Sequence, residues 1–175
     1  MTVSSLPEIT LRAPEPHDVA KMYRWENDAR EWASSATRGP VSMKRLQDYV
    51  DSYCADAFVA GELRLIIADA VTGESVGCVD LFEVDAVNRR AGVGIVIDES
   101  RRRKGYGRAA LLKMQWYAGE MLGLHQLWAT ICVDNVASRA LFTACGYKPC
   151  GCLRSWIRTG RKYADAYMYQ LLLAM

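Results

Sequence analysis

The stretch from Arg101 to Arg108 limits what this chain can be more than any other part of it. Four consecutive cations are followed by two glycines one residue apart and another arginine, and an apolar helical pattern begins directly afterwards. Glycine lets backbone N–H groups turn toward a ligand, and the N-terminus of a helix favours an anion. The stretch therefore indicates a pyrophosphate site where a loop enters a helix. The alternative is a basic surface turn that precedes a helix.

Composition and charge set only broad limits. The chain has 175 residues, 51% hydrophobic and 24% charged, which is ordinary for one globular domain spanning residues 1–175. Since 22 basic residues face 20 acidic ones, nothing in the net charge points to nucleic acid as a partner. No apolar run approaches the ~20 residues that cross a bilayer, and the first residues lack the layout of a signal peptide. We expect a cytoplasmic protein with no membrane partner.

Cysteine and histidine give no sign of a metal centre. The six cysteines lack a paired C-x-x-C pattern, and the only two histidines, His17 and His125, lie far from the cysteine cluster at positions 145, 150 and 152. We expect reduced thiols and no metal. So few histidines also give little support to Ser–His or Cys–His nucleophilic catalysis.

Hydrophobic periodicity predicts strands and helices in alternation. The predicted strands are 9–12, 63–69, 75–84, 91–97, 127–133, and two or three more between residues 147 and 173. The predicted helices are 18–27, one over 43–53 capped by Ser42, about 106–122, and 136–145. Short links make the strands within 63–97 an antiparallel meander. The long helix makes strand 127–133 parallel to strand 91–97, through a right-handed crossover.

Two glycines interrupt the strand that leads to the basic stretch. Gly92 and Gly94 are unusual there, because glycine weakens a strand interior. They fit a β-bulge or a place where a ligand approaches the backbone, and a simple bend of the sheet is equally compatible.

With this order of elements, the chain resembles the GNAT acyl-CoA-dependent N-acetyltransferases. The family's pyrophosphate motif is Gln or Arg, two residues, Gly, one residue, then Gly or Ala. The chain has Arg102-Arg103-Lys104-Gly105-Tyr106-Gly107 at the expected strand-to-helix junction. A later family block corresponds to Asn135, Ser138 and Gly146-Tyr147. The resemblance spans about residues 9–172 and is greatest to the branch of spermidine and ribosomal-protein N-terminal acetyltransferases.

The resemblance implies the fold, the cofactor and a set of cofactor-binding residues. The fold would be α/β (α+β), with a mostly antiparallel sheet of six to seven strands and about four helices. Acetyl-CoA would be the co-substrate, with its pyrophosphate on the loop and its pantetheine arm along the fourth strand, in a gap beside strand 127–133. The residues implied are Ile95, Val96, Ile97, Arg102, Arg103, Lys104, Gly105, Tyr106, Gly107, Arg108, Asn135, Ser138 and Phe142. For Asn135, simple capping of the following helix is the alternative.

The implied reaction is direct attack of an amine on the thioester in a ternary complex. A backbone N–H near Ile95 or Val96 would stabilise the oxyanion. Many relatives carry a tyrosine seven residues after the asparagine as general acid, and a glutamate in the fourth strand. This chain has Phe142 and Gly92 at those positions. Because neither residue can transfer a proton, we assign no catalytic residue.

Acidic residues near the expected acceptor cleft favour a cationic amine. The substrate-binding candidates are Glu31, Asp80 and Glu83, and solvated surface charge is the alternative for each. We predict acetyl transfer to a primary amine, either a polyamine or diamine or a protein N-terminal amine. An antibiotic or other small amine on the same scaffold, or a non-catalytic acyl-CoA-binding module, is the alternative. Aromatic residues of the C-terminal strands could also extend a sheet between subunits of a homo-oligomer.

Overall fold

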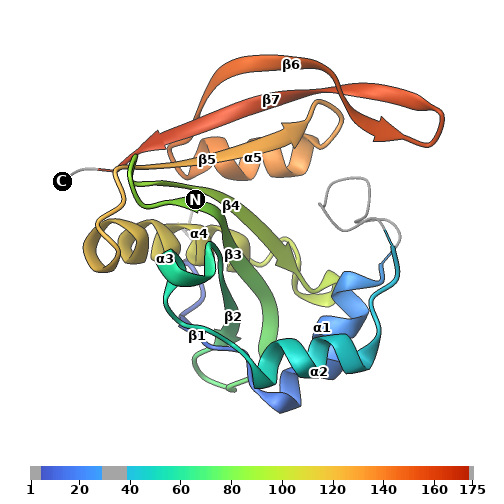
Figure 1. The fold of residues 1–175 in the computed structure, drawn as a ribbon, viewed down its shortest axis with the longest axis vertical. Coiled ribbons are helices and arrows are strands. Elements are labelled where there is room, and N and C mark those ends of the chain that lie inside the picture. Colours follow the sequence, from blue (N-terminus) through green and yellow to red (C-terminus); the bar gives the residue numbers. More distant parts are fainter. Residues whose placement is uncertain (1–4, 29–38, 174–175) are drawn as a thin grey trace.

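A computed structural model describes residues 5–28 and 39–173, which build one seven-stranded sheet with helices on both faces (Figure 1). The strands are β1 (Ile9–Arg12), β2 (Leu63–Asp69), β3 (Ser75–Asp85), β4 (Arg90–Ile97), β5 (Gln126–Cys132), β6 (Lys148–Thr159) and β7 (Lys162–Leu172). Their order across the sheet is β1-β2-β3-β4-β5-β7-β6. Only β4 and β5 are parallel. The predicted fold class, meander and crossover are confirmed.

Five α-helices lie within the described residues. They are α1 (Val19–Glu26), α2 (Met43–Asp51), α3 (Ala57–Ala60), α4 (Tyr106–Trp116) and α5 (Val136–Ala144). The Ser42 hydroxyl accepts the Arg45 N–H and caps α2, as predicted. Two features differ from the prediction. Helix α3 was not predicted, because a single turn is too short to show a periodicity. The predicted helix 106–122 changes after Trp116 into a π-helical segment, Tyr117–Met121.

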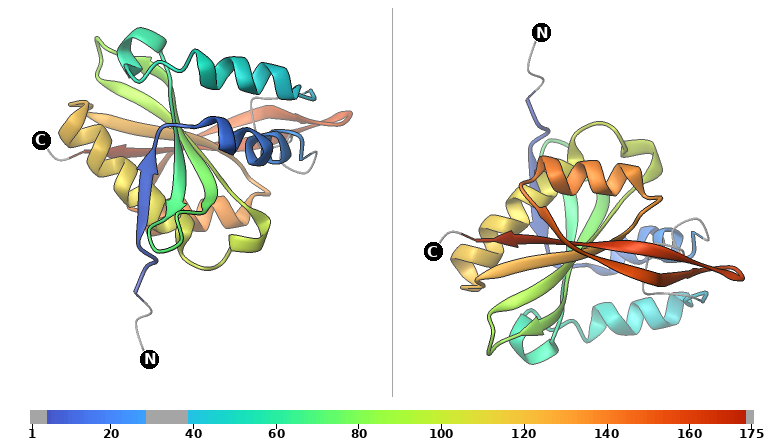
Figure 2. Two further views of the ribbon diagram at one scale, coloured as in Figure 1. Left: turned by 90° about the horizontal axis from the view of Figure 1, so that it is seen from below. Right: turned by 90° about the horizontal axis from the view of Figure 1, so that it is seen from above.

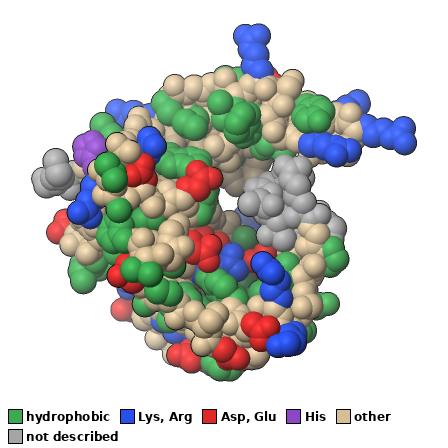
Figure 3. All heavy atoms as spheres, viewed as in Figure 1, with side chains coloured by type: hydrophobic (Ala, Val, Ile, Leu, Met, Phe, Trp, Pro, Cys, Tyr) green, Lys and Arg blue, Asp and Glu red, His purple; other side chains and the backbone are tan. Residues whose placement is uncertain are grey.

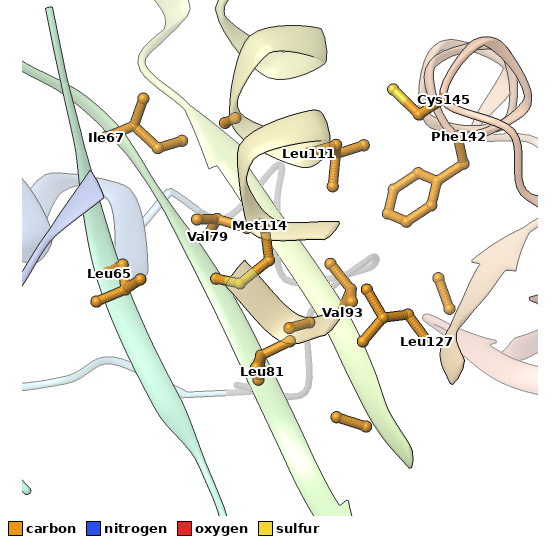
Figure 4. Packing of buried hydrophobic residues seen from close by; sticks show 14 of the residues in the cluster. Leu65, Ile67, Val79, Leu81, Val93, Leu111, Met114, Leu127, Phe142 and Cys145 are labelled. Carbon is orange, nitrogen blue, oxygen red and sulfur yellow. The ribbon is translucent and has the colours of Figure 1, made fainter. Parts of the chain in front are cut away.

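The helices cover opposite faces of the sheet because successive strand side chains alternate in direction. Leu111 and Met114 of α4 pack on one face, against Val79, Leu81 and Val93 (Figure 4). On the other face, a second apolar cluster joins α1 and α2 to the sheet through Val19, Met22, Trp25, Leu46, Val50, Ile66 and Cys78. Figure 2 shows α4 and α5 on one side of the strands and α2 on the other.

Strands β4 and β5 separate toward their C-terminal ends. They pair only from Arg90 to Gly92 on β4, opposite Gln126 to Trp128 on β5. Beyond this point β4 stays paired with β3 as far as Ile97, and β5 stays paired with β7 as far as Cys132. The second half of β4 therefore has an edge with no strand partner among the described residues, as the expected cofactor gap requires (Figure 1).

Of the two glycines in β4, Gly92 is required by the packing of the neighbouring strand. A Cβ atom at Gly92 would lie 2.3 Å from the Phe82 ring of β3, whereas one at Gly94 would lie 3.8 Å from it. The Phe82 ring also meets Trp128 edge-on, with centroids 5.2 Å apart. The β3–β4 register shifts between Phe82 and Asp85, and Glu83 has a positive φ of 49° there. Gly92 thus makes room for an aromatic ring rather than a ligand, and the bulge lies in β3.

A buried carboxylate anchors the chain just before α1. Asp18 is fully buried and accepts hydrogen bonds from Arg12 at 2.6 and 2.8 Å, from the Ser75 hydroxyl, and from the Glu15 N–H at 2.9 Å. Burial opposes its ionisation, but these hydrogen bonds outweigh that effect and lower the pKa of Asp18 to about 2.

Because Asp18 is ionised in the folded protein, we predict that the protein loses folding stability in acid. Because its folded-state pKa lies below the unfolded value of 3.8, its contribution is complete above pH 4 and disappears as the pH falls toward 2. We expect the free energy of unfolding to lose about 2 kcal/mol over that range. In urea unfolding, the Asp18→Asn variant should not show this loss of unfolding free energy in acid. The Asp48→Asn variant, which changes a side chain that is 59% exposed, should still show it. Equal acid sensitivity of wild type and Asp18→Asn would contradict this assignment.

Candidate active site

The loop between β4 and α4 has a backbone suited to a pyrophosphate. Arg103 and Gly105 have φ values of 59° and 87°, in the left-handed region, and such residues turn neighbouring N–H groups toward one side. Helix α4 begins at Tyr106, so its unpaired first N–H groups open onto the same loop. The side chains of Arg103 and Arg108 are exposed beside it. The loop therefore combines backbone N–H groups with exposed positive charge.

The other cations of the stretch fold back onto the protein. Arg102 donates from Nε to the carbonyl of Ile97 at 3.0 Å, and Lys104 donates from Nζ to the carbonyl of Ser100 at 2.9 Å. Both side chains are exposed and lie at the loop.

Tyr106 was expected among the cofactor-binding residues, but its side chain points elsewhere. The ring is 7% exposed, and its hydroxyl donates a hydrogen bond to Asp69 at the end of β2. This bond is the main cause that lowers the pKa of Asp69 to about 2 and raises the pKa of Tyr106. Only the backbone N–H of Tyr106 is left to face an anion.

Gly107 serves the packing of α4 as well as the loop. A Cβ atom there would lie 3.2 Å from Leu141 of α5 and 3.6 Å from Ile97 of β4. The absence of a side chain therefore lets the first turn of α4 approach both neighbours closely.

Two of the three predicted β4 residues present their backbone to the gap. The Asp98 N–H donates to the carbonyl of Val76 on β3. Because strand backbone groups alternate in direction, Val96 also faces β3, while Ile95 and Ile97 face the β5 side. Val96 instead packs its side chain against the cluster of α1 and α2. The backbone role expected of Val96 is therefore wrong, and Ile95 is the better placed donor for an oxyanion.

A cavity of about 440 Å³ opens beside this edge. It lies between the end of α1 and the end of β4, and its walls include Trp25, Val96, Ile97 and Arg102. The Trp25 indole N–H donates to Asp98 at 3.1 Å, which fixes α1 to the strand end. The loop, the β4 edge and the cavity are therefore continuous.

Asn135 and Ser138 meet at the start of α5. The Asn135 side-chain oxygen accepts the Ser138 N–H at 3.0 Å, so Asn135 caps the helix. The side-chain oxygen of Asn135 therefore has the helix-capping role that was the alternative to cofactor binding. The amide nitrogen makes no hydrogen bond to a residue that the structure describes, which leaves it able to orient an amide of a pantetheine arm.

Phe142 lies in the core. It is 3% exposed and lies among the core side chains of Figure 4. Its ring meets the Tyr147 ring edge-on, with centroids 4.9 Å apart. Behind it, Tyr147 is 1% exposed, and burial raises the pKa of its hydroxyl. Neither residue supplies a ready proton to the gap, so the absence of an assigned catalytic acid stands.

The acceptor side contains a charge cluster that the sequence analysis missed. Arg64 donates to both carboxylate oxygens of Asp80 at 2.9 and 2.7 Å and to Glu26 at 2.6 Å. Its guanidinium also lies 5.9 Å from the Tyr49 ring centroid. Both carboxylates of this group therefore share one guanidinium. A lone arginine within the otherwise apolar run of residues 63–68 was the available signal.

The three predicted substrate-binding residues have different outcomes. Asp80 belongs to the Arg64 cluster, and its Cβ lies 4.0 Å from the position of a Cβ at Gly94, so it borders β4. Glu83 is exposed in the bulge of β3. Glu31 lies outside the described residues. Figure 3 shows this face hollowed near its centre, with acidic and basic side chains in the hollow.

Residues 5–28 and 39–173 contain no group of three or more His, Cys, Asp or Glu side chains that could hold a metal ion. None of their helices is long and apolar enough to cross a membrane.

Comparison with known proteins agrees with this geometry. The model of the acetyltransferase (GNAT) domain matches residues 8–148. The chain is 24% identical over 165 residues to a spermidine N(1)-acetyltransferase of Vibrio cholerae, covering 94% of this chain and 93% of that protein. It is 32% identical over 100 residues to the putative ribosomal N-acetyltransferase YdaF of Bacillus subtilis, covering 57% of this chain and 55% of that protein.

The fold is shared with a solved relative as well. The Vibrio cholerae spermidine N-acetyltransferase in complex with CoA and spermine superposes with a TM-score of 0.84 at 23% identity, over 94% of this chain and 95% of that one. The loop, the β4 edge and the capping asparagine fit the cofactor that the sequence motif implied. The chain belongs to the GNAT family and is an acetyl-CoA-dependent N-acetyltransferase.

Proposed function

We propose that this enzyme acetylates a polyamine or diamine, whose primary amine attacks acetyl-CoA directly in a ternary complex. The observation that carries the proposal is the cluster of Arg64, Asp80 and Glu26, which places two partly buried carboxylates beside β4, with Asp80 next to Gly94. A polyamine carries several ammonium groups, so one can be held by the cluster while another reaches the thioester.

Electrostatics favour this acceptor over a neutral one. A unit charge pair 4 Å apart near a protein surface interacts by about 4 kcal/mol at an effective dielectric constant of 20. The Asp80 and Glu26 side chains are 24% and 17% exposed, so water screens them only in part. Similarity to spermidine N(1)-acetyltransferases of Vibrio cholerae and Escherichia coli supports the same substrate class.

The chemical step would depend on position and backbone more than on side-chain acids. In this proposal the pantetheine arm lies along Ile95 and Ile97, and the Ile95 N–H stabilises the tetrahedral oxyanion. A free alkyl amine has a pKa of ~10.4, so the attacking nitrogen loses its proton to solvent at the cavity or to a carboxylate of the cluster through water. CoA then leaves as a thiolate, because Phe142 has no proton to donate to it.

A protein N-terminal amine is the second candidate acceptor. It is favoured by the 32% identity to the putative ribosomal N-acetyltransferase YdaF, although that match covers only 57% of this chain.

An amine panel separates the candidates. We expect release of CoA thiol from acetyl-CoA to be fastest with spermidine, spermine or a diamine, compared with an N-terminal peptide and an aminoglycoside at equal concentration. A faster peptide would replace the polyamine assignment, and a faster aminoglycoside would point to the antibiotic alternative. Tight acetyl-CoA binding without turnover of any amine would indicate a binding module.

The cluster itself can be tested at Asp80. We expect Asp80→Asn to raise the KM for spermidine about 10-fold, because removing one charge weakens ammonium binding by about 1.4 kcal/mol, and to leave the Kd of acetyl-CoA unchanged. The matched control is Glu83→Gln, which removes an exposed carboxylate on the same strand. If Glu83→Gln raised the KM more than Asp80→Asn, the acceptor site would lie at the bulge.

We also propose that the enzyme forms a homo-oligomer. One relative, the spermidine N-acetyltransferase of Vibrio cholerae, has been solved as a dodecamer. In this chain β6 is an edge strand, and Trp156 and Tyr163 on its hairpin with β7 are 60% and 61% exposed. Exposed aromatic residues on a strand edge favour pairing with another chain. Light scattering after size exclusion measures the oligomeric state directly.

A further inference from the structure

We propose that Asp69 and Tyr106 are positioning residues for the cofactor: their hydrogen bond holds the loop before α4 in its pyrophosphate-binding shape before acetyl-CoA arrives. The inference rests on the cofactor site described above and concerns residues that would not touch the cofactor with their side chains.

The bond joins the loop to a part of the sheet that is itself well fixed. Tyr106 stands between Gly105 and Gly107, and its hydroxyl donates to one oxygen of Asp69. The other Asp69 oxygen accepts the N–H groups of Val71 at 3.0 Å and Thr72 at 2.9 Å, so it closes the β2–β3 turn. Because the carboxylate cannot rotate without breaking the turn, it holds the first residue of α4 at one place.

The same turn holds the other end of the loop. Glu74, five residues after Asp69, forms an ion pair with Arg101 and a second one with Lys21 at 3.1 Å. Both ion pairs lower the pKa of the Glu74 carboxyl. The β2–β3 turn therefore contacts the loop at its start, Arg101, and at its end, Tyr106.

The N-terminal segment braces the middle of the loop. A Cβ atom at Gly105 would lie 2.9 Å from Pro7 and 3.3 Å from Leu6. The left-handed backbone of Gly105 is thus packed against the N-terminal segment. The two left-handed residues, Arg103 and Gly105, lie between fixed points on both sides.

This arrangement matters because binding to a mobile loop includes the cost of ordering it. A loop already held in its bound shape avoids that cost, which raises affinity without adding a contact to the ligand. The hydroxyl of Tyr106 is the relevant group, since a phenylalanine would fill the same apolar space and lose only the bond to Asp69. Removing the hydroxyl should therefore change cofactor affinity and leave the chemistry alone.

The test is acetyl-CoA binding by isothermal titration calorimetry without any acceptor amine. We expect Tyr106→Phe to raise the Kd about 5-fold, with the same rise in the KM for acetyl-CoA and an unchanged kcat. Asp69→Asn should shift the Kd in the same direction. The double variant should bind no more weakly than the weaker single one, because both changes remove one interaction.

A matched control is Tyr53→Phe. The Tyr53 hydroxyl donates to the backbone carbonyl of Arg64 at 2.8 Å, away from the loop. This variant should lower the Tm by a similar amount and keep the acetyl-CoA affinity of the wild type. The proposal is overturned if Tyr106→Phe binds acetyl-CoA as tightly as the wild type, or if Tyr53→Phe weakens binding equally. Lack of turnover with polyamines would count against the proposed function alone, because this binding measurement contains no acceptor.

Discussion

Reversing two charges on the cofactor loop, Arg103→Glu together with Arg108→Glu, is expected to weaken acetyl-CoA binding about 1000-fold. Each exposed guanidinium lies beside the N–H groups that would hold the pyrophosphate. Losing two charge-assisted contacts of about 2 kcal/mol each gives a factor of this size. Calorimetry with acetyl-CoA and with CoA measures it.

The control for this variant preserves the total change of charge. Arg158→Glu with Arg161→Glu makes the same reversal at the turn between β6 and β7, where both side chains are exposed. It should bind acetyl-CoA within about 2-fold of the wild type, since exposed charges beyond ~10 Å are screened at 0.1 M salt. Equal loss in both variants would reveal a general charge effect, and no loss in the first would remove the pyrophosphate from this loop.

A single methyl group at Gly77 is expected to have the largest effect on stability. A Cβ atom there would lie 2.2 Å from the backbone carbonyl oxygen of Val96, so Gly77→Ala must push β4 away from β3. We expect the free energy of unfolding to fall by about 3 kcal/mol, at the upper end for overpacking, because backbone cannot move aside as a flexible side chain can. Urea unfolding measures the loss.

Gly77→Ala should also impair the cofactor site, because β4 carries the Ile95 and Ile97 edge. The control is Gly151→Ala in β6, where a Cβ atom meets nothing within 4 Å. That change should alter stability by no more than about 0.5 kcal/mol. A stable Gly77→Ala variant with normal acetyl-CoA affinity would show that β3 and β4 can separate without consequence.

The sequence predicted those parts of the fold that depend on local periodicity and chain connection. The strands of the meander are apolar runs joined by short links, and the long helix after the glycines favours a crossover to a parallel strand. The turn α3 was missed because one turn carries no period. The π-helical segment after Trp116 was missed because the apolar pattern of the sequence was read with the α-helical period.

The site could be predicted where the backbone alone matters. The glycines and cations of residues 101–108 predict the loop, and the order of elements along the chain places it after β4. Side-chain partners across the sheet could not be read in the same way. Gly92 leaves room for the Phe82 ring, Arg64 donates hydrogen bonds to Asp80, and the Tyr106 hydroxyl donates one to Asp69. The two residues of each pair are at least 10 positions apart in the chain. Such pairs arise from tertiary packing, which a single sequence does not report.

The short pairing of β4 with β5 gives the enzyme a mechanical property. Strands β1–β4 and β5–β7 form two half-sheets joined along their backbones by three residue pairs. A pantetheine arm that contacts Ile95 on one half and Asn135 beyond the other would bridge them like an added strand. Bound cofactor then acts as a structural brace, and saturation at 100 times the Kd contributes about 2.7 kcal/mol to the folded state. Acetyl-CoA in this gap is therefore expected to raise the urea concentration at which the enzyme unfolds.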